Sequence, residues 1–195
     1  RKTKRTKQMS ENNLKDIIKQ EFLKCASDPS YFMNKYCSIQ HPTRGKIPFV
    51  LYEYQKDALT QFKENDYNVV LKARQLGIST LSAGYALWMM TFHSDKNILV
   101  VATKQDTAKN LVTKVRFMHS NLPTWLRNAC TEDNKLSLKY SNGSQIKAVS
   151  SSEDAGRSEA LSLLILDEAA FIDKIDVIWG AAQQTLATGG QCLAI

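Results

Sequence analysis

Two short stretches of the chain combine residue types that can bind phosphates and activate water. The first is Lys72–Thr80, reading Lys-Ala-Arg-Gln-Leu-Gly-Ile-Ser-Thr, between a predicted strand and a predicted helix. A phosphate-binding loop belongs there, because the amides of a helix N-terminus surround phosphates and a hydroxyl holds magnesium. In the standard loop a lysine follows the second glycine, but Ile78 occupies that position here. Lys72, five residues before Gly77, is the lysine that we expect to reach the phosphates.

The other side chains of this loop have separate predicted tasks. Ser79 aligns with the hydroxyl that binds Mg²⁺, and Thr80 is its alternative. Arg74 could stabilise the charge that develops on the γ-phosphate of ATP. A plain strand-to-helix turn with an incidental lysine would explain the stretch about as well when it is taken alone. The predicted nucleotide contacts of the loop are Lys72, Arg74, Gln75, Gly77, Ser79 and Thr80.

The second stretch places two carboxylates after a run of four aliphatic residues. Leu163–Leu166 is typical of a buried central strand, and Asp167 and Glu168 follow it directly. Ligands of open α/β sheets bind at the carboxyl ends of strands. Asp167 can therefore hold Mg²⁺ while Glu168 polarises the attacking water. Two acids at a helix N-terminus are the plainer reading, but the glycine loop upstream favours the catalytic one.

Two further features could complete a nucleotide site. Gln55 carries an amide that can donate to and accept from an adenine edge, and the ring of Tyr54 can stack on a base. Arg157, in the loop 150–158 before the acidic strand, could stabilise the γ-phosphate in its own or a neighbouring subunit. Pairing of Arg157 with a surface carboxylate is equally open.

Alternating strands and helices must position these residues, which predicts an α/β fold with a mainly parallel sheet. An Asn-Gly turn at 142–143 predicts a hairpin that interrupts the parallel series. The expected strands are 68–71, 98–102, 136–140, 145–149, 163–166 and 192–195, and the expected helices are 80–92 and 108–118.

The first part of the chain predicts a small appendage, which places the domains at 1–46 and 47–195. Ser10 can cap a helix whose apolar stripe runs from Leu14 to Phe22. The basic residues before it, Arg1–Lys7, could touch nucleic acid, but a solvated, disordered end is the expected form. Asp28–Pro48 holds three of the four prolines and is expected to be an irregular connection.

Composition limits the kinds of partner and site. The 195 residues carry a formal net charge of +7, which favours an anionic partner such as nucleic acid. No apolar run is long enough to span a bilayer, so a soluble, intracellular protein is expected. The four cysteines show no paired spacing, and Cys37 with His41 lacks a second pair, so no disulfide framework and no zinc site is expected.

Four stretches, in this order and spacing, resemble the large terminase subunit of tailed bacteriophages. The resemblance spans Ile47 to Ile195, and a loop with the lysine moved forward is itself familiar in that family. The stretches are Tyr54–Gln55, Lys72–Thr80, Asp167–Ala170 and Thr185–Gly190.

The resemblance implies a P-loop ATPase of the additional-strand, catalytic-glutamate type. Such a protein forms a homo-oligomeric ring in the host cytoplasm and moves double-stranded DNA into a procapsid, with ATP and Mg²⁺ as cofactors. Its partners would be the portal protein and the small terminase subunit. A nuclease domain and a coupling motif are expected after Ile195. The resemblance makes Lys72 a phosphate ligand, Arg74 a cis finger, Ser79 and Asp167 the Mg²⁺ ligands, Glu168 the base and Arg157 a possible trans finger.

Two other functions are compatible with the same residues. A superfamily-2 helicase also has a glutamine motif before its P-loop and an Asp-Glu pair after it, although the displaced lysine argues against it. A nucleotide-binding assembly module that does not hydrolyse ATP would follow from the missing lysine at position 78.

Overall fold

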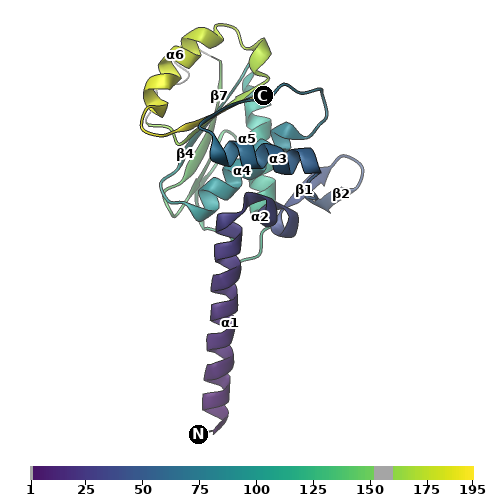
Figure 1. Cartoon of the computed structure of the whole chain (residues 1–195), viewed down its shortest axis with the longest axis vertical. Coiled ribbons are helices and arrows are strands. Elements are labelled where there is room, and N and C mark those ends of the chain that lie inside the picture. The colour runs from purple at the N-terminus through teal and green to yellow at the C-terminus, as the bar shows by residue number, and fades with distance from the viewer. Residues whose placement is uncertain (1, 152–159) are drawn as a thin grey trace.

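The computed structural model describes residues 2–151 and 160–195, with the side chains of the first helix described from Asn13 onward. Seven strands form its main sheet, and helices pack against the sheet on both sides (Figure 1). The strands are β3 (Tyr67–Val69), β4 (Asn97–Ala102), β5 (Cys130–Asp133), β6 (Ser137–Tyr140), β7 (Gln145–Ser150), β8 (Leu163–Asp167) and β9 (Gln191–Ala194).

The order of the strands is β3-β9-β8-β4-β7-β6-β5. All pairs from β3 to β7 are parallel, whereas β6 pairs antiparallel with β7 and with β5. β9 therefore lies as an additional strand between β3, which leads into the glycine loop, and β8, which ends in the acidic pair. This confirms the predicted mainly parallel α/β sheet. The glycine loop follows β3 and the acidic pair ends β8, and only β9 separates these two strands. The two predicted stretches therefore lie at the same edge of the sheet, at the carboxyl ends of its parallel strands.

The predicted hairpin is confirmed as β6–β7. Gly143 in its turn has φ +84°, a left-handed conformation that glycine adopts without steric cost. The Asn142 side chain accepts from the Ser144 amide at 3.1 Å, which closes the turn locally. β5 extends this antiparallel edge and was not predicted, since all four of its residues are exposed and show no apolar alternation.

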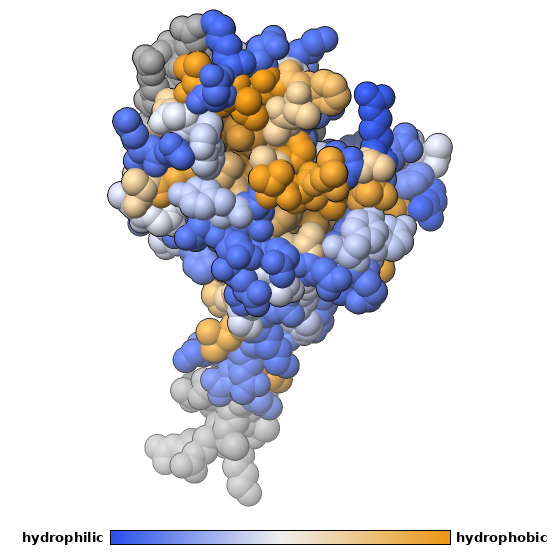
Figure 2. All heavy atoms as spheres, turned by 45° about the horizontal axis from the view of Figure 1, so that its top comes forward, coloured by the Kyte–Doolittle hydropathy of each residue, from blue (hydrophilic) through white to orange (hydrophobic). Residues whose placement is uncertain are grey.

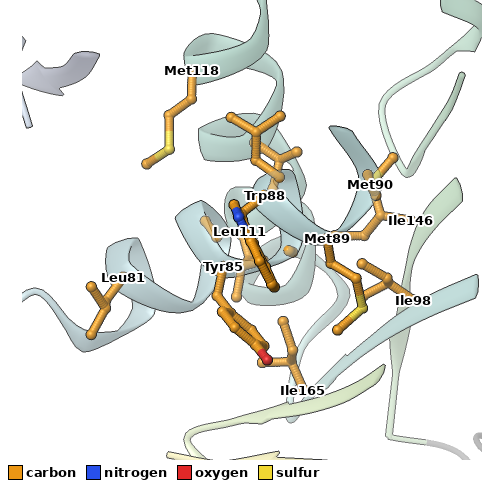
Figure 3. Packing of buried hydrophobic residues seen from close by; sticks show 14 of the residues in the cluster. Leu81, Tyr85, Trp88, Met89, Met90, Ile98, Leu111, Met118, Ile146 and Ile165 are labelled. Atoms are coloured by element: carbon orange, nitrogen blue, oxygen red, sulfur yellow. The ribbon is translucent and has the colours of Figure 1, made fainter. Parts of the chain in front are cut away.

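Alternating side chains of the buried strands form two apolar layers. On β4, Ile98 and Val100 face a layer built with helices α4 (Ile78–Phe92) and α5 (Gln105–Ser120). Leu99 and Val101 face the opposite layer, which is built with α6 (Ile175–Leu186). Figure 3 shows the first layer, in which aromatic and sulfur-containing side chains of α4 lie over the aliphatic side chains of the sheet. The site loops are thus fixed to a sheet that is buried on both faces.

The segment before the sheet is more regular than expected. It forms α1 (Lys2–Ser27), α2 (Pro29–Tyr36) and a separate two-stranded sheet of β1 (Ser38–His41) and β2 (Gly45–Pro48), and α3 (Glu53–Glu64) follows.

Three expectations for this segment were wrong. α1 continues through Ser10, so that serine is not a cap, and the backbone from Lys2 is helical rather than a disordered end. The expected irregular connection folds because Asp28 accepts hydrogen bonds from the amides of Ser30 and Tyr31, with Pro29 at the first helical position. The prolines of this segment therefore lie at the boundaries of regular elements: Pro29 begins α2, Pro42 follows β1 and Pro48 ends β2.

α1 projects away from the rest of the molecule (Figure 1). Its predicted stripe packs only near the end of the helix, where Phe22 contacts Phe92 with ring centroids 5.0 Å apart. Leu14 and Ile17 remain 58% and 56% exposed. At the opposite end of the molecule, Figure 2 shows a broad apolar surface. Within the described residues, no helix has both the length and the apolar character needed to cross a membrane.

Candidate nucleotide-binding site

The glycine loop leaves β3 and turns sharply into α4. Gly77 is the N-cap of α4 with φ +71°, and Gln75 two residues earlier has φ +65°. A side chain at Gly77 would be strained by this conformation, and its Cβ would also lie 2.9 Å from the Gln55 amide nitrogen. The second glycine of the loop is therefore required both by the turn and by the close approach of α3. The turn aims the first free amides of α4 at the carboxyl end of the sheet.

Tyr54 and Gln55 hold this loop from α3. The Tyr54 hydroxyl and the Gln55 Nε2 both donate to the Leu76 carbonyl, at 2.8 and 3.1 Å. Gln55 Oε1 also accepts from the Tyr52 amide at 3.1 Å, and Gln55 is only 3% exposed. These two bonds leave the Gln55 side chain with one free Nε2 hydrogen and one free Oε1 lone pair for a ligand. The structure thus shows a loop-holding role that sequence reasoning did not foresee for these residues.

A cleft of about 590 Å³ opens beside these residues. Tyr54, Gln55, Gly77 and Thr80 line it, together with His41 and Arg44 of the β1–β2 hairpin. The ring of Tyr54 stacks on Tyr52, with centroids 5.6 Å apart and planes at 8°. The sequence did not predict that His41 and Arg44 line this cleft, because Asp28–Pro48 was expected to be an irregular connection. A basic residue, an aromatic pair and a cleft of this size are suited to a nucleoside.

The two predicted magnesium ligands meet in the structure. Ser79 Oγ donates to Asp167 Oδ1 at 3.0 Å, across 88 residues of sequence. Asp167 ends β8 and is 5% exposed, while Ser79 lies in the first turn of α4. This hydrogen bond ties the glycine loop to the acidic strand.

These two residues suit Mg²⁺ as a donor set. Mg²⁺ in phosphate-handling proteins uses one or two protein ligands and completes an octahedron with waters and phosphate oxygens. Apart from its bond to Ser79, Asp167 has no hydrogen bond to a described residue, so Oδ2 can coordinate. Nowhere in the described chain do three His, Cys, Asp or Glu side chains gather as an all-protein metal site. Ser79 and Asp167 fit a Mg²⁺ site that phosphate oxygens and waters complete.

Glu168 follows Asp167 in a left-handed conformation, with φ 57° and ψ 43°. A non-glycine residue meets a small steric penalty there and is found there mainly when its surroundings fix it. The Ala169 amide donates to the Ile195 carbonyl, and the Ile195 amide donates to the Leu166 carbonyl, which fixes the backbone on both sides. Glu168 is exposed and lines a cleft of about 240 Å³ with Lys72 and Arg74. The predicted base thus lines the same cleft as the two predicted cations.

Position 78 supplies no charge to the site. Ile78 is 4% exposed and belongs to the apolar layer under α4. Among the other predicted residues, Gln75 and Arg74 are exposed, and Lys72, Ser79 and Thr80 are partly buried along the loop. Arg157 lies outside the described residues.

Comparison with known proteins gives a consistent result. The sequence matches the family described as "Terminase large subunit, T4likevirus-type, N-terminal" over residues 69–192. The large terminase of bacteriophage HK97 has 21% identity and a TM-score of 0.68, over 87% of this chain and 36% of that chain. The ATPase domain of the large terminase of Thermus phage P74-26 has 21% identity and a TM-score of 0.56, over 75% and 64%. The large terminase of another thermophilic bacteriophage, solved in complex with ADP, has 15% identity and a TM-score of 0.57, over 73% and 37%.

The structural similarities show a shared P-loop fold, and this chain spans about a third of the HK97 protein. The family match is stronger support for identity, because it covers more than half of the chain and includes both the glycine loop and the acidic pair. It also favours a terminase over the helicase alternative. The chain therefore belongs to the terminase large subunit family, T4-like type, and represents the N-terminal part of such a subunit.

Proposed function

We propose that this domain binds ATP with Mg²⁺ and hydrolyses it, and that a terminase motor uses this turnover to move double-stranded DNA into a procapsid. The observation that supports the proposal most is the 3.0 Å hydrogen bond from Ser79 to Asp167, which joins the phosphate loop to the acidic strand. A related large terminase has been solved with ADP, which supports nucleotide as the ligand.

Each side chain of the site has a task in this proposal. The phosphates lie over the N-terminus of α4, where Lys72 and Arg74 offset their charge. Ser79 and Asp167 hold Mg²⁺, which when bound neutralises charge on the phosphate oxygens. Glu168 accepts the proton of the attacking water. The fixed backbone of Glu168 holds the start of its side chain beside the cleft, from which the carboxylate can reach the attacking water.

The base of the nucleotide would occupy the cleft between α3 and the β1–β2 hairpin. Tyr54 and Gln55 already hold the Leu76 carbonyl, so their contact with a base would be coupled to the shape of the phosphate loop. In this proposal the pair both contacts the adenine and transmits its presence to the loop. Gln75 and Thr80 complete the wall on the loop side.

The partners of the proposed motor follow from its task. A net charge of +7 suits a domain that works on DNA. The domain would act within a homo-oligomeric ring on the portal protein, with the small terminase subunit, in the host cytoplasm. Arg157 is then a candidate trans finger, and an endonuclease domain would belong to the complete protein.

Glu168→Gln tests the proposed hydrolysis. The variant keeps the size and the backbone of Glu168 but cannot accept a proton, so ATP binding should stay within a few-fold of the original. The rate of phosphate release should fall by about 100-fold or more. Single-turnover measurements with protein in excess over labelled ATP are suitable, because they also detect slow hydrolysis.

Asp176→Asn is the matched control, because Asp176 is an exposed acid on the first turn of α6. Its rate should equal that of the original chain. Normal phosphate release by Glu168→Gln would remove Glu168 from catalysis and overturn the proposed mechanism.

A nucleotide-binding module without hydrolysis is the second candidate, and the burial of Ile78 favours it. Such a module would bind ATP with the same clefts but release no phosphate in the single-turnover measurement. The result for the original chain therefore separates the two candidates before any variant is made.

A further inference from the structure

A lysine outside the glycine loop also approaches the site. Lys114 lies on α5, a helix that packs against α4 and against the sheet. Neither the sequence motifs nor the family resemblance draws attention to it, because it lies far beyond the loop in the sequence. Its approach is produced only by the packing of α5 on α4.

Lys114 lines a cavity of about 410 Å³ that reaches the phosphate loop. Asn110, Thr113, Lys114 and Phe117 recur at helical spacing on one face of α5 and form one wall. Thr80, in the first turn of α4, contributes from the loop side. Thr80 also lines the cleft beside Tyr54 and Gln55, so the two cavities share a lining residue in the first turn of α4.

The charge of Lys114 is coupled to the site. Burial lowers the pKa of Lys114, the carboxylate of Asp167 opposes that change, and the ammonium of Lys72 adds to it. The cavity that Lys114 shares with Thr80 agrees with this coupling, because Thr80 follows Ser79 in the first turn of α4.

Lys114 has no partner for its charge within the described residues. No hydrogen bond or ion pair joins its ammonium to any of them. Lys109 on the same helix differs, since its Nζ lies 3.9 Å from an Asp106 oxygen at the surface. Because no group of the described residues pairs with it, the partly buried Lys114 ammonium can bind an anion that enters the cavity.

We propose that Lys114 is a nucleotide-binding residue that contacts the terminal phosphate of ATP, beside Asp167. The inference rests on the proposed nucleotide site. The oxygens of a γ-phosphate beside the Mg²⁺ ligands would be the nearest anionic group to an ammonium at this place. Lys114 and Lys72 would then reach the phosphates from α5 and from the loop, which together replace the lysine that position 78 lacks. ADP lacks the phosphate that Lys114 contacts, so the residue would favour ATP over ADP.

Lys114→Met tests this inference by its effect on the preference for ATP. Fluorescent ATP and ADP are titrated, with Mg²⁺ present, into the 195-residue chain and its variants. Lys114→Met should weaken ATP binding by about tenfold or more and ADP binding by less than about threefold. Lys114→Arg should restore most of the preference, and Lys109→Met on the same helix should leave it unchanged.

Thermal unfolding without nucleotide distinguishes ligand binding from a structural role. Removal of an unpartnered charge should leave the unfolding midpoint of Lys114→Met unchanged or raise it. An unchanged ratio of ATP to ADP affinity in Lys114→Met would overturn the inference while leaving the proposed function in place. If the original chain bound neither nucleotide, both would be overturned.

Discussion

At the scale of single residues, the site depends on contacts that span long stretches of sequence. Ser79 and Asp167 are 88 residues apart and share a hydrogen bond of 3.0 Å. Tyr54 and Gln55 reach the loop from another helix and donate to the same carbonyl, that of Leu76. These bonds restrict the loop before any phosphate binds, which reduces the ordering cost of binding.

Gly77→Ala tests how far the loop depends on its left-handed glycine. A side chain at φ +71° is strained, and its Cβ would approach the Gln55 nitrogen to 2.9 Å. We expect the free energy of unfolding to fall by about 1–2 kcal/mol, measured by urea denaturation. ATP affinity should also fall, because the loop must shift to accept the methyl group.

Gly180→Ala is the matched control. Gly180 lies inside α6, and an added Cβ there would meet no heavy atom within 4 Å. Alanine should therefore stabilise the helix by about 0.5–1 kcal/mol. Equal effects at both positions would mean that the Gly77 conformation is not a constraint on the fold.

Local chemistry made part of the site predictable. Lys72–Thr80 and the pair Asp167 and Glu168 were found because a glycine loop and an acidic strand end each have a recognisable order of residue types. Two other residues beside the site, Lys114 and Arg44, could not be predicted from a local order of residue types. The cation Lys114 and the hairpin residue Arg44 approach through tertiary packing, which a local pattern does not encode.

At the scale of elements, a cluster of hydrogen bonds fixes α1 to α2. Oε1 of Glu21 accepts from Lys35, Tyr31 and Tyr36, each at 2.7 Å. Hydrogen bonding by Lys35, then by Tyr31 and Tyr36, lowers the pKa of Glu21 to about 2. The ionised form is thus favoured by the fold, and the projecting helix is held through its last turns.

Glu21→Gln tests this contact through its pH dependence. A carboxylate with a lowered pKa stabilises the folded state above its usual pKa, 4.5, and the stabilisation is lost as pH falls towards about 2. The original chain should therefore be more stable than Glu21→Gln at about pH 6, and the difference should shrink as pH falls from 4.5 to 2. Chemical denaturation at a series of pH values measures the difference.

Glu53→Gln serves as the control for this series. Glu53 pairs with Lys56 at 2.6 Å, but its side chain is 85% exposed, so solvent screens the pair. The stability difference between Glu53→Gln and the original chain should therefore be small throughout the series. A difference for Glu21→Gln that is constant with pH would argue against the ionised cluster.

Apolar periodicity predicted the buried elements better than the exposed ones. Strand β8 and helix α5 were predicted because their burial imposes a continuous or helical apolar pattern. α6 was not predicted, although its buried Ile178, Ala182 and Leu186 do follow helical spacing. The signal was weak there because the helix also carries apolar and small residues on its outer face, which leaves few polar positions to mark that face.

At the scale of the whole molecule, residues before and after Ile47 share one apolar core. Phe32 of α2 is fully buried and packs edge-on against Phe92 of α4, with centroids 5.1 Å apart. Trp88 Nε1 donates to the Cys25 carbonyl at 2.9 Å. The division into 1–46 and 47–195 stays a prediction, and these contacts suggest that the two segments fold together.

Phe32→Ala tests whether the first segment and the sheet unfold as one cooperative unit. Truncation of a fully buried phenylalanine should lower the free energy of unfolding by about 3–5 kcal/mol, whereas Phe171→Ala, at a residue that is 69% exposed, should change it little. Far-UV circular dichroism and tryptophan fluorescence should report the same single transition in the original chain and in both variants, because Trp88 lies at the contact between the two segments. Two separated transitions, with only the first shifted by Phe32→Ala, would instead show that residues 1–46 form an independent unit. A single shifted transition would mean that the β1–β2 hairpin, and with it one wall of the nucleotide cleft, is held by the same core that positions the phosphate loop.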